Sequence, residues 1–289
     1  MPAMTRVANA PVNFGIYRAT SAPIGPRELL TELAEAGYDG VDSGPIRYLG
    51  ADDLRQAGMG LAGGWVDLRY GDADGFAADL PGLRAALEAF TAVPADDPRF
   101  APRPTLACPR SPARFERPGG LVPGAPEETW PQFAARVQAA ADMCRAAGLE
   151  PAFHQHLGTD VETPSEVARL LELTDIGVCL DTGHLWLAGG DPVAVLRDWS
   201  GRIRQIHVKD ADRKILAASG DLGSAVAAGC FPALGRGEVD IAGFVAALRG
   251  AGYVGWVVVE QDAPPTGRDL DAILADQRAN RDLLRSVGL

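Results

Sequence analysis

Short apolar runs alternate with longer amphipathic stretches along the whole chain, and this alternation constrains the fold more than any other feature. The amphipathic stretches place apolar residues three and four positions apart, as helices with one buried face do. Strands that alternate with helices form parallel sheets, and eight such pairs are enough to close a barrel. We therefore expect an α/β fold, a single (β/α)8 TIM barrel spanning residues 1–289. The expected strands are residues 6–12, 37–44, 59–68, 103–108, 148–154, 175–181, 202–208 and 253–260.

The helical patterns between these runs support the same fold. Thr163 before Pro164 and Asp191 before Pro192 are typical of capped helix starts. An open doubly wound sheet would usually carry a glycine-rich phosphate turn after its first strand, but the sequence there reads PVNFGIYRA. The expected helices are residues 26–37, 51–58, 80–93, 128–148, 164–174, 191–199, 241–252 and 269–287.

Two segments interrupt this rhythm. Residues 109–126 are rich in Pro, Gly and Arg, and residues 210–238 separate the seventh strand from its helix with short helical pieces of their own. Both fall in strand-to-helix connections, which form the catalytic face of a barrel. They are compatible with surface insertions and equally with a lid over a site.

The charge balance limits the classes of partner. With 27 Lys and Arg against 38 Asp and Glu, the net charge is −11, so we expect no nucleic-acid partner. No apolar run approaches the ~20 residues of a membrane span, and the N-terminal residues lack the apolar core of a secretory signal. We expect a cytoplasmic protein without a membrane anchor, and the sequence leaves open whether it is a homo-oligomer.

Histidines and carboxylates gather at the expected strand ends. Asp181 ends one apolar run and Glu260 ends another, and an isolated buried carboxylate must be paired or bound to a cation. The histidines of the chain lie at or just beyond the ends of the fifth, sixth and seventh strands. They are His154, His156, His184 and His207.

Successive members of this set are separated by whole strand–helix units, so their side chains should converge at the barrel mouth. We expect His154, Asp181, His207 and Glu260 to hold one divalent ion. Two imidazoles and two carboxylates suit Mn, Co, Zn or Fe(II). The alternative is a layer of salt bridges that closes the barrel mouth.

Several motifs in this region carry a resemblance to a known family. The chain resembles the xylose-isomerase-like barrel superfamily of sugar isomerases and epimerases, and most of all its branch with 2-keto-myo-inositol (inosose) dehydratase, an enzyme of inositol catabolism. The resemblance is strong from about residue 130 to 265 and loose over the first 70 residues. The motifs are AFHQHLGTDVETPSEVARLL, VCLDTGHLWLAGGDP, RIRQIHVKD, GCFPALGRGEVD and GYVGWVVVEQD.

The resemblance implies roles for individual residues. It implies a single divalent ion on the four residues named above, with His154 where many isomerases have a glutamate that also acts as base. It further implies substrate contacts for His184 and Arg213, and a place close to the substrate for His156. The first strand segment, NAPVNFGIYRA, lacks the tryptophan and aspartate found in that branch.

Such a site would form an enediolate from a ketone and its neighbouring hydroxyl, because a divalent ion stabilises the charge that develops. His156 or Glu260 would take the α-proton. Lys209 would protonate the leaving hydroxyl or polarise the carbonyl. The alternative for Lys209 is an ion pair with Asp210 or Asp42.

Asp42 and Trp65 lie near the ends of the second and third expected strands, where they would line a pocket, with core packing as the alternative for Trp65. The expected protein is a metal-dependent lyase that dehydrates an inosose-like ketopolyol. An isomerase or epimerase of ketoses or inososes would use the same metal site. A non-catalytic barrel subunit is the further alternative.

Overall fold

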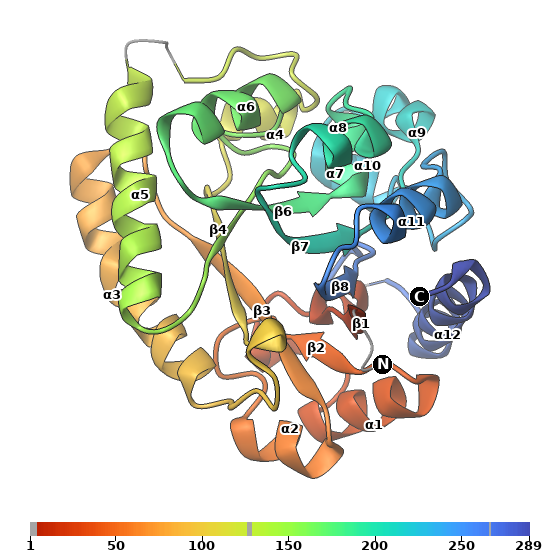
Figure 1. Ribbon diagram of the computed structural model, residues 1–289. Helices are drawn as coiled ribbons and strands as arrows, with labels where there is room; N and C mark the ends of the chain where they lie inside the picture. Colours follow the sequence, from red (N-terminus) through yellow and green to blue (C-terminus); the bar gives the residue numbers. More distant parts are fainter. Residues whose placement is uncertain (1–4, 126–128, 266) are drawn as a thin grey trace.

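Eight parallel strands pair in chain order and close into a barrel, with β1 paired to β8 (Figure 1). The computed structural model describes residues 5–125, 129–265 and 267–289. The predicted TIM barrel is confirmed, and each strand overlaps the apolar run expected for it. The strands are β1 (Thr5–Asn9), β2 (Gly40–Asp42), β3 (Gly60–Asp67), β4 (Arg103–Ala107), β5 (Ala152–His154), β6 (Gly177–Asp181), β7 (Ile203–Val208) and β8 (Gly255–Val259).

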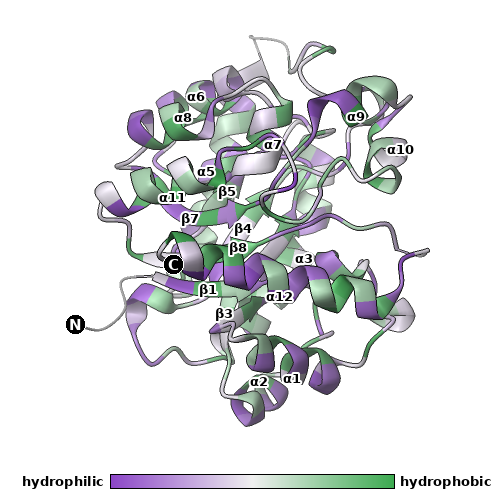
Figure 2. Cartoon of the chain, turned by 90° about the vertical axis from the view of Figure 1, so that its right-hand side faces the viewer, coloured by the Kyte–Doolittle hydropathy of each residue, from purple (hydrophilic) through white to green (hydrophobic). Residues whose placement is uncertain are grey.

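A helix of 7 to 19 residues follows each strand and covers the outside of the barrel (Figure 1). These helices are α1 (Pro26–Ala36), α2 (Ala51–Ala57), α3 (Ala73–Thr91), α5 (Trp130–Ala146), α6 (Pro164–Leu173), α8 (Pro192–Asp198), α11 (Ile241–Gly250) and α12 (Leu270–Val287). Hydrophilic and hydrophobic residues share the same helices, as Figure 2 shows for α1, α2 and α12. In α1 the apolar residues Leu29, Leu30 and Leu33 are buried. The three- and four-residue spacing of the apolar positions thus correctly predicts which face of the helix packs on the barrel.

The strands are covered on both faces, and this explains their continuous apolar sequences. Every residue of β6 and of β8 is buried. Burying a carboxylate in such a strand costs free energy unless a cation or hydrogen-bond donors contact it. Asp181 at the end of β6 therefore requires such a partner.

The predicted helix caps are confirmed. The Glu166 backbone N–H donates to Thr163 Oγ1 (3.4 Å) and the Glu166 carboxylate accepts the Thr163 N–H (3.0 Å), a capping box for α6. The Asp191 carboxylate accepts the backbone N–H groups of Val193 and Ala194 at the start of α8.

The start of α3 differs from the expectation. The helix begins at Ala73 rather than at residue 80, because the Asp72 carboxylate accepts the N–H groups of Asp74 and Gly75 (3.3 and 2.8 Å). Pro81 therefore lies inside the helix instead of near its start. Proline is typical of the first turn of a helix, so Pro81 led to a predicted helix start at residue 80, seven residues after the observed start.

The two segments that interrupt the rhythm add short helices to the barrel. The first contains α4 (Pro112–Glu116), and the second contains α9 (Arg213–Ala218) and α10 (Leu222–Ala227), which packs on α4. A further short helix, α7 (Thr182–Leu187), follows β6 directly. None of the helices in the described part of the chain is both long and apolar enough to cross a bilayer.

Candidate metal centre and adjoining cavity

Four polar side chains from four neighbouring strands meet at one end of the barrel. His154 ends β5 and Asp181 ends β6. His207 is the second-to-last residue of β7, and Glu260 follows β8 directly. Parallel strands end at a common rim, and Asp181 pairs in register with His207. One candidate ligand atom from each side chain lies within 4.8 Å of the other three.

The donor atoms of this cluster are turned toward one another. His207 Nδ1 lies 3.2 Å from both His154 Nε2 and Glu260 Oε2, and His154 Nε2 lies 3.6 Å from Asp181 Oδ2. Asp181 uses its other oxygen, Oδ1, to accept the backbone N–H of His184 (2.9 Å) at the start of α7. Asp181 Oδ2 is fully buried and accepts no hydrogen bond among the described residues, and its shortest ion-pair contact is with Lys209 Nζ at 3.2 Å.

These observations fit a divalent cation. Ligand atoms at about 2.0–2.2 Å from one ion lie about 3–4 Å from each other, so only small shifts would bring all four side chains into a first shell. Two imidazole nitrogens and two carboxylate oxygens suit borderline ions such as Mn, Co, Zn and Fe(II). Asp181 Oδ2, which accepts no hydrogen bond among the described residues, is the oxygen that such an ion would bind.

A thiol also lies within reach of the two imidazoles. Cys179 precedes Asp181 by two positions on the same face of β6 and forms a second candidate ligand group with His154 and His207. Burial raises the pKa of the Cys179 thiol to about 11, so the neutral form dominates near neutral pH. The carboxylate of Asp181 is the better ligand of the two.

Asn13 fixes the backbone on both sides of Glu260. Its Nδ2 donates to the carbonyl oxygen of Val259 (3.0 Å), and its Oδ1 accepts the backbone N–H of Gln261 (2.7 Å). Asn13 is fully buried in the loop after β1. The residue therefore positions the end of β8, and with it the Glu260 carboxylate.

Lys209 is fully buried beside the cluster and is one of only two lysines in the chain. Its Nζ lies 3.2 Å from Asp181 Oδ2 and 3.0 Å from Glu260 Oε2. It also donates to Asp262 Oδ1 (3.1 Å). One ammonium thus contacts three carboxylates, so an ion-pair layer does exist at the barrel mouth.

Lys209 does form ion pairs at the barrel mouth, as its alternative predicted, but its partners are Asp181, Glu260 and Asp262 and not Asp210 or Asp42. Asp210 instead accepts the backbone N–H groups of Gly235 and Gly237 (both 2.8 Å) and so holds a turn. The strand alternation explains the difference, because Lys209 follows His207 by two positions and faces the same side.

The charges at the site shift its pKa values in a consistent way. Burial favours the neutral form of Asp181, but Lys209 outweighs it and holds the pKa of that carboxyl well below its usual range. Burial likewise opposes ionisation of Glu260, and His207 and Lys209 keep its pKa low. Burial lowers the pKa of His154, which keeps its imidazole in the neutral form that binds metals.

His156 lies just beyond β5 at the edge of the same site. Its Nδ1 lies 2.7 Å from the carbonyl oxygen of Leu157, and because a carbonyl only accepts, Nδ1 carries the proton and Nε2 keeps its lone pair. The ring packs against His184 with 3.7 Å between centroids and against Trp65 with 5.2 Å. Burial lowers the pKa of His156 well below its usual value.

Asp262 completes a third group of candidate ligand atoms with His156 and His184. Lys209 Nζ lies 2.8 Å from His184 Nε2, so this ammonium provides the positive charge here. Burial opposes ionisation of Asp262, but Lys209 lowers the pKa of its carboxyl to about 2.

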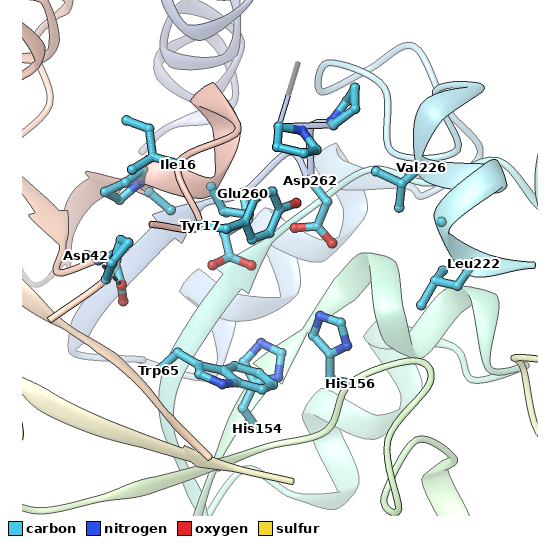
Figure 3. Close-up of a pocket in the computed structure, with 18 of the residues that line it drawn as sticks. Ile16, Tyr17, Asp42, Trp65, His154, His156, Leu222, Val226, Glu260 and Asp262 are labelled. Atoms are coloured by element: carbon cyan, nitrogen blue, oxygen red, sulfur yellow. Dashed lines mark hydrogen bonds between the residues drawn. The ribbon is translucent and has the colours of Figure 1, made fainter. Parts of the chain in front are cut away.

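The four-residue cluster and the group that contains Asp262 both border a cavity of about 550 Å³ at the barrel mouth (Figure 3). Asp42 and Trp65 line it together with His154, His156 and Glu260. Trp65 is 36% exposed, so it is not a core residue. Burial raises the pKa of Asp42 to about 6.

Two residues expected to touch the substrate lie elsewhere in the described structure. His184 is fully buried behind His156 and does not line the cavity. Arg213 begins α9, donates to the carbonyl oxygen of Trp186 through Nε (3.1 Å) and Nη2 (2.7 Å), and does not line the cavity either. Their contact with a substrate stays a prediction that rests on the resemblance.

Several residues of the site have no role predicted from the sequence. Asp262 could have been found, because it follows Glu260 by two positions and extends the same alternation. Tyr17, Phe115 and Leu222 also line the cavity, but they come from loops and short helices that carry no motif. The positions of Phe115 and Leu222 depend on how the two inserted segments fold back, whereas Tyr17 lies in the connection after β1.

A model of the xylose isomerase-like TIM barrel family matches residues 109–285 of the chain. The rhizopine catabolism protein MocC of Rhizobium meliloti is 32% identical over 82% of this chain and 75% of its own length. An inosose dehydratase of Geobacillus kaustophilus is 28% identical over 82% of this chain and 80% of its own length.

The fold also matches a crystal structure of the IolI protein with a bound zinc atom. The TM-score is 0.70 at 13% sequence identity, and the match covers 98% of each chain. At this identity the likeness concerns the fold of the barrel.

Proposed function

Since the chain belongs to the xylose isomerase-like TIM barrel family, we propose that it is a metal-dependent enzyme that removes water from an inosose-like cyclic ketone. The observation that carries the proposal is the cluster of His154, Asp181, His207 and Glu260 at the floor of the cavity. These four residues would hold one divalent ion. When bound, the ion would stabilise negative charge on the ketone oxygen and its neighbouring oxygen.

The residues around the cluster can move the protons that the reaction requires. His156 Nε2 would take the proton from the carbon next to the carbonyl, because its lone pair is free and its ring borders the cavity. The electron pair of the broken C–H bond then forms the carbon–carbon double bond as the β-hydroxyl leaves. Lys209, or a proton relayed through Glu260, would protonate that hydroxyl so that it departs as water.

The choice of water elimination is supported by the relatives and by the first ligand. One relative is named an inosose dehydratase and the other a rhizopine catabolism protein. His154 stands where many isomerases of the superfamily have a glutamate that ligates and acts as base. An imidazole that binds the metal cannot also take the substrate proton, so proton transfer falls to other residues.

Isomerisation or epimerisation of a ketose or inosose is the second candidate. Figure 3 shows Glu260 and Asp262 on one side of the cavity and His154 and His156 on the other. Glu260, Asp262 and His156 are separate titratable groups at one rim, so one of them could remove a proton from the substrate and another could return it. This arrangement suits an epimerase as well as a dehydratase.

The test uses protein stripped of metal and then loaded with Mn or Co. Each form is incubated with a panel of inososes and ketohexoses, and the products are identified by NMR and ultraviolet absorbance. Dehydration of an inosose gives a conjugated dione with new ultraviolet absorbance, whereas an isomer adds no chromophore. Isomeric products without a chromophore would favour the second candidate, and no product from any ketone would favour a non-catalytic barrel.

A further inference from the structure

The upper walls of the cavity differ chemically from its floor. The polar and charged groups lie at the strand ends and on the segments that follow them directly. Above them the wall is built from Ile16, Phe115, Leu222, Val226, Pro264 and Pro265. Figure 3 shows Leu222 and Val226 on one side of the opening and Ile16 and Tyr17 on the other.

The two inserted segments build one side of this apolar wall together. Phe115 comes from α4, and Leu222 and Val226 come from α10, which packs on α4. The packing is close, since a Cβ placed on Gly223 would lie 3.3 Å from the Phe115 ring. The Arg110 guanidinium lies 3.4 Å from the centroid of the same ring and covers it. The wall is therefore formed in advance of any ligand.

A fully hydroxylated ring does not suit this upper part of the cavity. Each buried hydroxyl needs a hydrogen-bond partner, and leaving one unsatisfied is costly. Tyr17 also lines the cavity, but its hydroxyl already donates to the carbonyl oxygen of Ala263 (2.9 Å). A cavity of about 550 Å³ also exceeds what one six-membered polyol ring fills.

We propose that the substrate is a polyhydroxylated cyclic ketone that carries an apolar substituent, an aromatic ring or a short branched alkyl group joined through oxygen. The ketone end lies over the cluster at the floor. The substituent packs between Phe115, Leu222 and Val226 on one side and Ile16 and Tyr17 on the other. The inference rests on the proposed function for the ketone end, while the apolar subsite stands on the lining residues.

The first experiment compares an inosose with its mono-O-benzyl ethers as substrates of the metal-loaded protein. The KM of the best ether should be about 10- to 100-fold lower than that of the parent, because apolar groups in a fitting pocket contribute on this scale. Equal KM values, or a preference for the parent, would overturn the subsite.

Two matched valine variants test which part of the cavity lowers the KM of the ether. Val226→Thr keeps the shape of the side chain and adds a hydroxyl to the wall, so it should raise the KM of the ether about 5- to 10-fold and that of the parent much less. Val193→Thr makes the same change on α8, where Val193 is half-buried and does not line the cavity, and should alter neither KM. Equal effects of Val226→Thr on both substrates would contradict the placement of the substituent.

A binding measurement separates this inference from the proposed function. If no ketone is turned over, the proposed reaction fails, but calorimetry with inositol and mono-O-benzyl inositol still tests the subsite. Tighter binding of the ether, weakened by Val226→Thr and not by Val193→Thr, supports it. Equal binding of the two polyols overturns it.

Discussion

Lys209→Met should reveal how strongly the buried ammonium holds the barrel mouth together. In the wild type, Lys209 Nζ lies within 3.0–3.2 Å of carboxylate oxygens of Asp181, Glu260 and Asp262. Methionine keeps most of the volume but leaves these carboxylates without their cation. Removing one partner of a buried ion pair costs about 3–5 kcal/mol. For a chain of this size the metal-free variant should melt about 5–8 °C lower than the wild type.

The pH dependence of this loss has a definite sign. Without Lys209, the carboxyl pKa values rise above their unfolded values, so protonation stabilises the folded variant as the pH falls. The wild-type pKa values lie below their unfolded values, and their stabilisation persists until the pH approaches the unfolded values near 4. The difference in melting temperature should therefore narrow between pH 8 and pH 5.

The assay is thermal unfolding followed by circular dichroism, with chelator and then with saturating Mn. Lys214→Met is the control, because Lys214 is the only other lysine and its side chain is 89% exposed. Mn should stabilise Lys209→Met more than the wild type, since the ion replaces the lost positive charge. A metal-free variant that melts within about 2 °C of the wild type would refute the reasoning.

Three further predictions concern single side chains. His156→Gln should keep metal and fold but lower the rate about 10²–10⁴-fold. If the variant exchanges the substrate α-proton with deuterium as fast as the wild type does, another residue is the base. Asn13→Ala removes both backbone contacts that fix Glu260 and should weaken Mn affinity about 10-fold in a chelator competition, so an unchanged affinity would contradict its positioning role. Arg213→Ala should raise KM and leave the metal content intact, and loss of metal would rule out the role assigned to Arg213.

The fold was predictable because the local sequence signals for strands and helices agree with the burial that a parallel barrel imposes on them. Each strand of a parallel barrel is buried on both faces and therefore reads as an apolar run, and the caps at Thr163 and Asp191 mark helix starts within a few residues. The boundary of α3 failed because Asp72 offered a cap upstream of Pro81, and a proline is a stronger visible signal than an aspartate.

The floor of the site was predictable for the same reason, since polar residues at strand ends break the apolar pattern. His154, Asp181, His207 and Glu260 follow from chain order alone once the barrel is assumed. The partners of Lys209 were not predictable from nearest neighbours in the chain, because they come from β6 and β8. The apolar wall depends on how α4 and α10 pack on each other, and the sequence of two loops does not specify that.

The most direct test of the metal centre is the amount of divalent ion bound per chain, measured by elemental analysis after loading with Mn or Zn and removal of free ion. The wild type should bind one ion per chain. Asp181→Asn should bind almost none and keep a folded barrel by circular dichroism, because its ligand oxygen has lost its charge. A wild type that retains no ion, or an Asp181→Asn variant that retains a full equivalent, would contradict a metal centre at these residues.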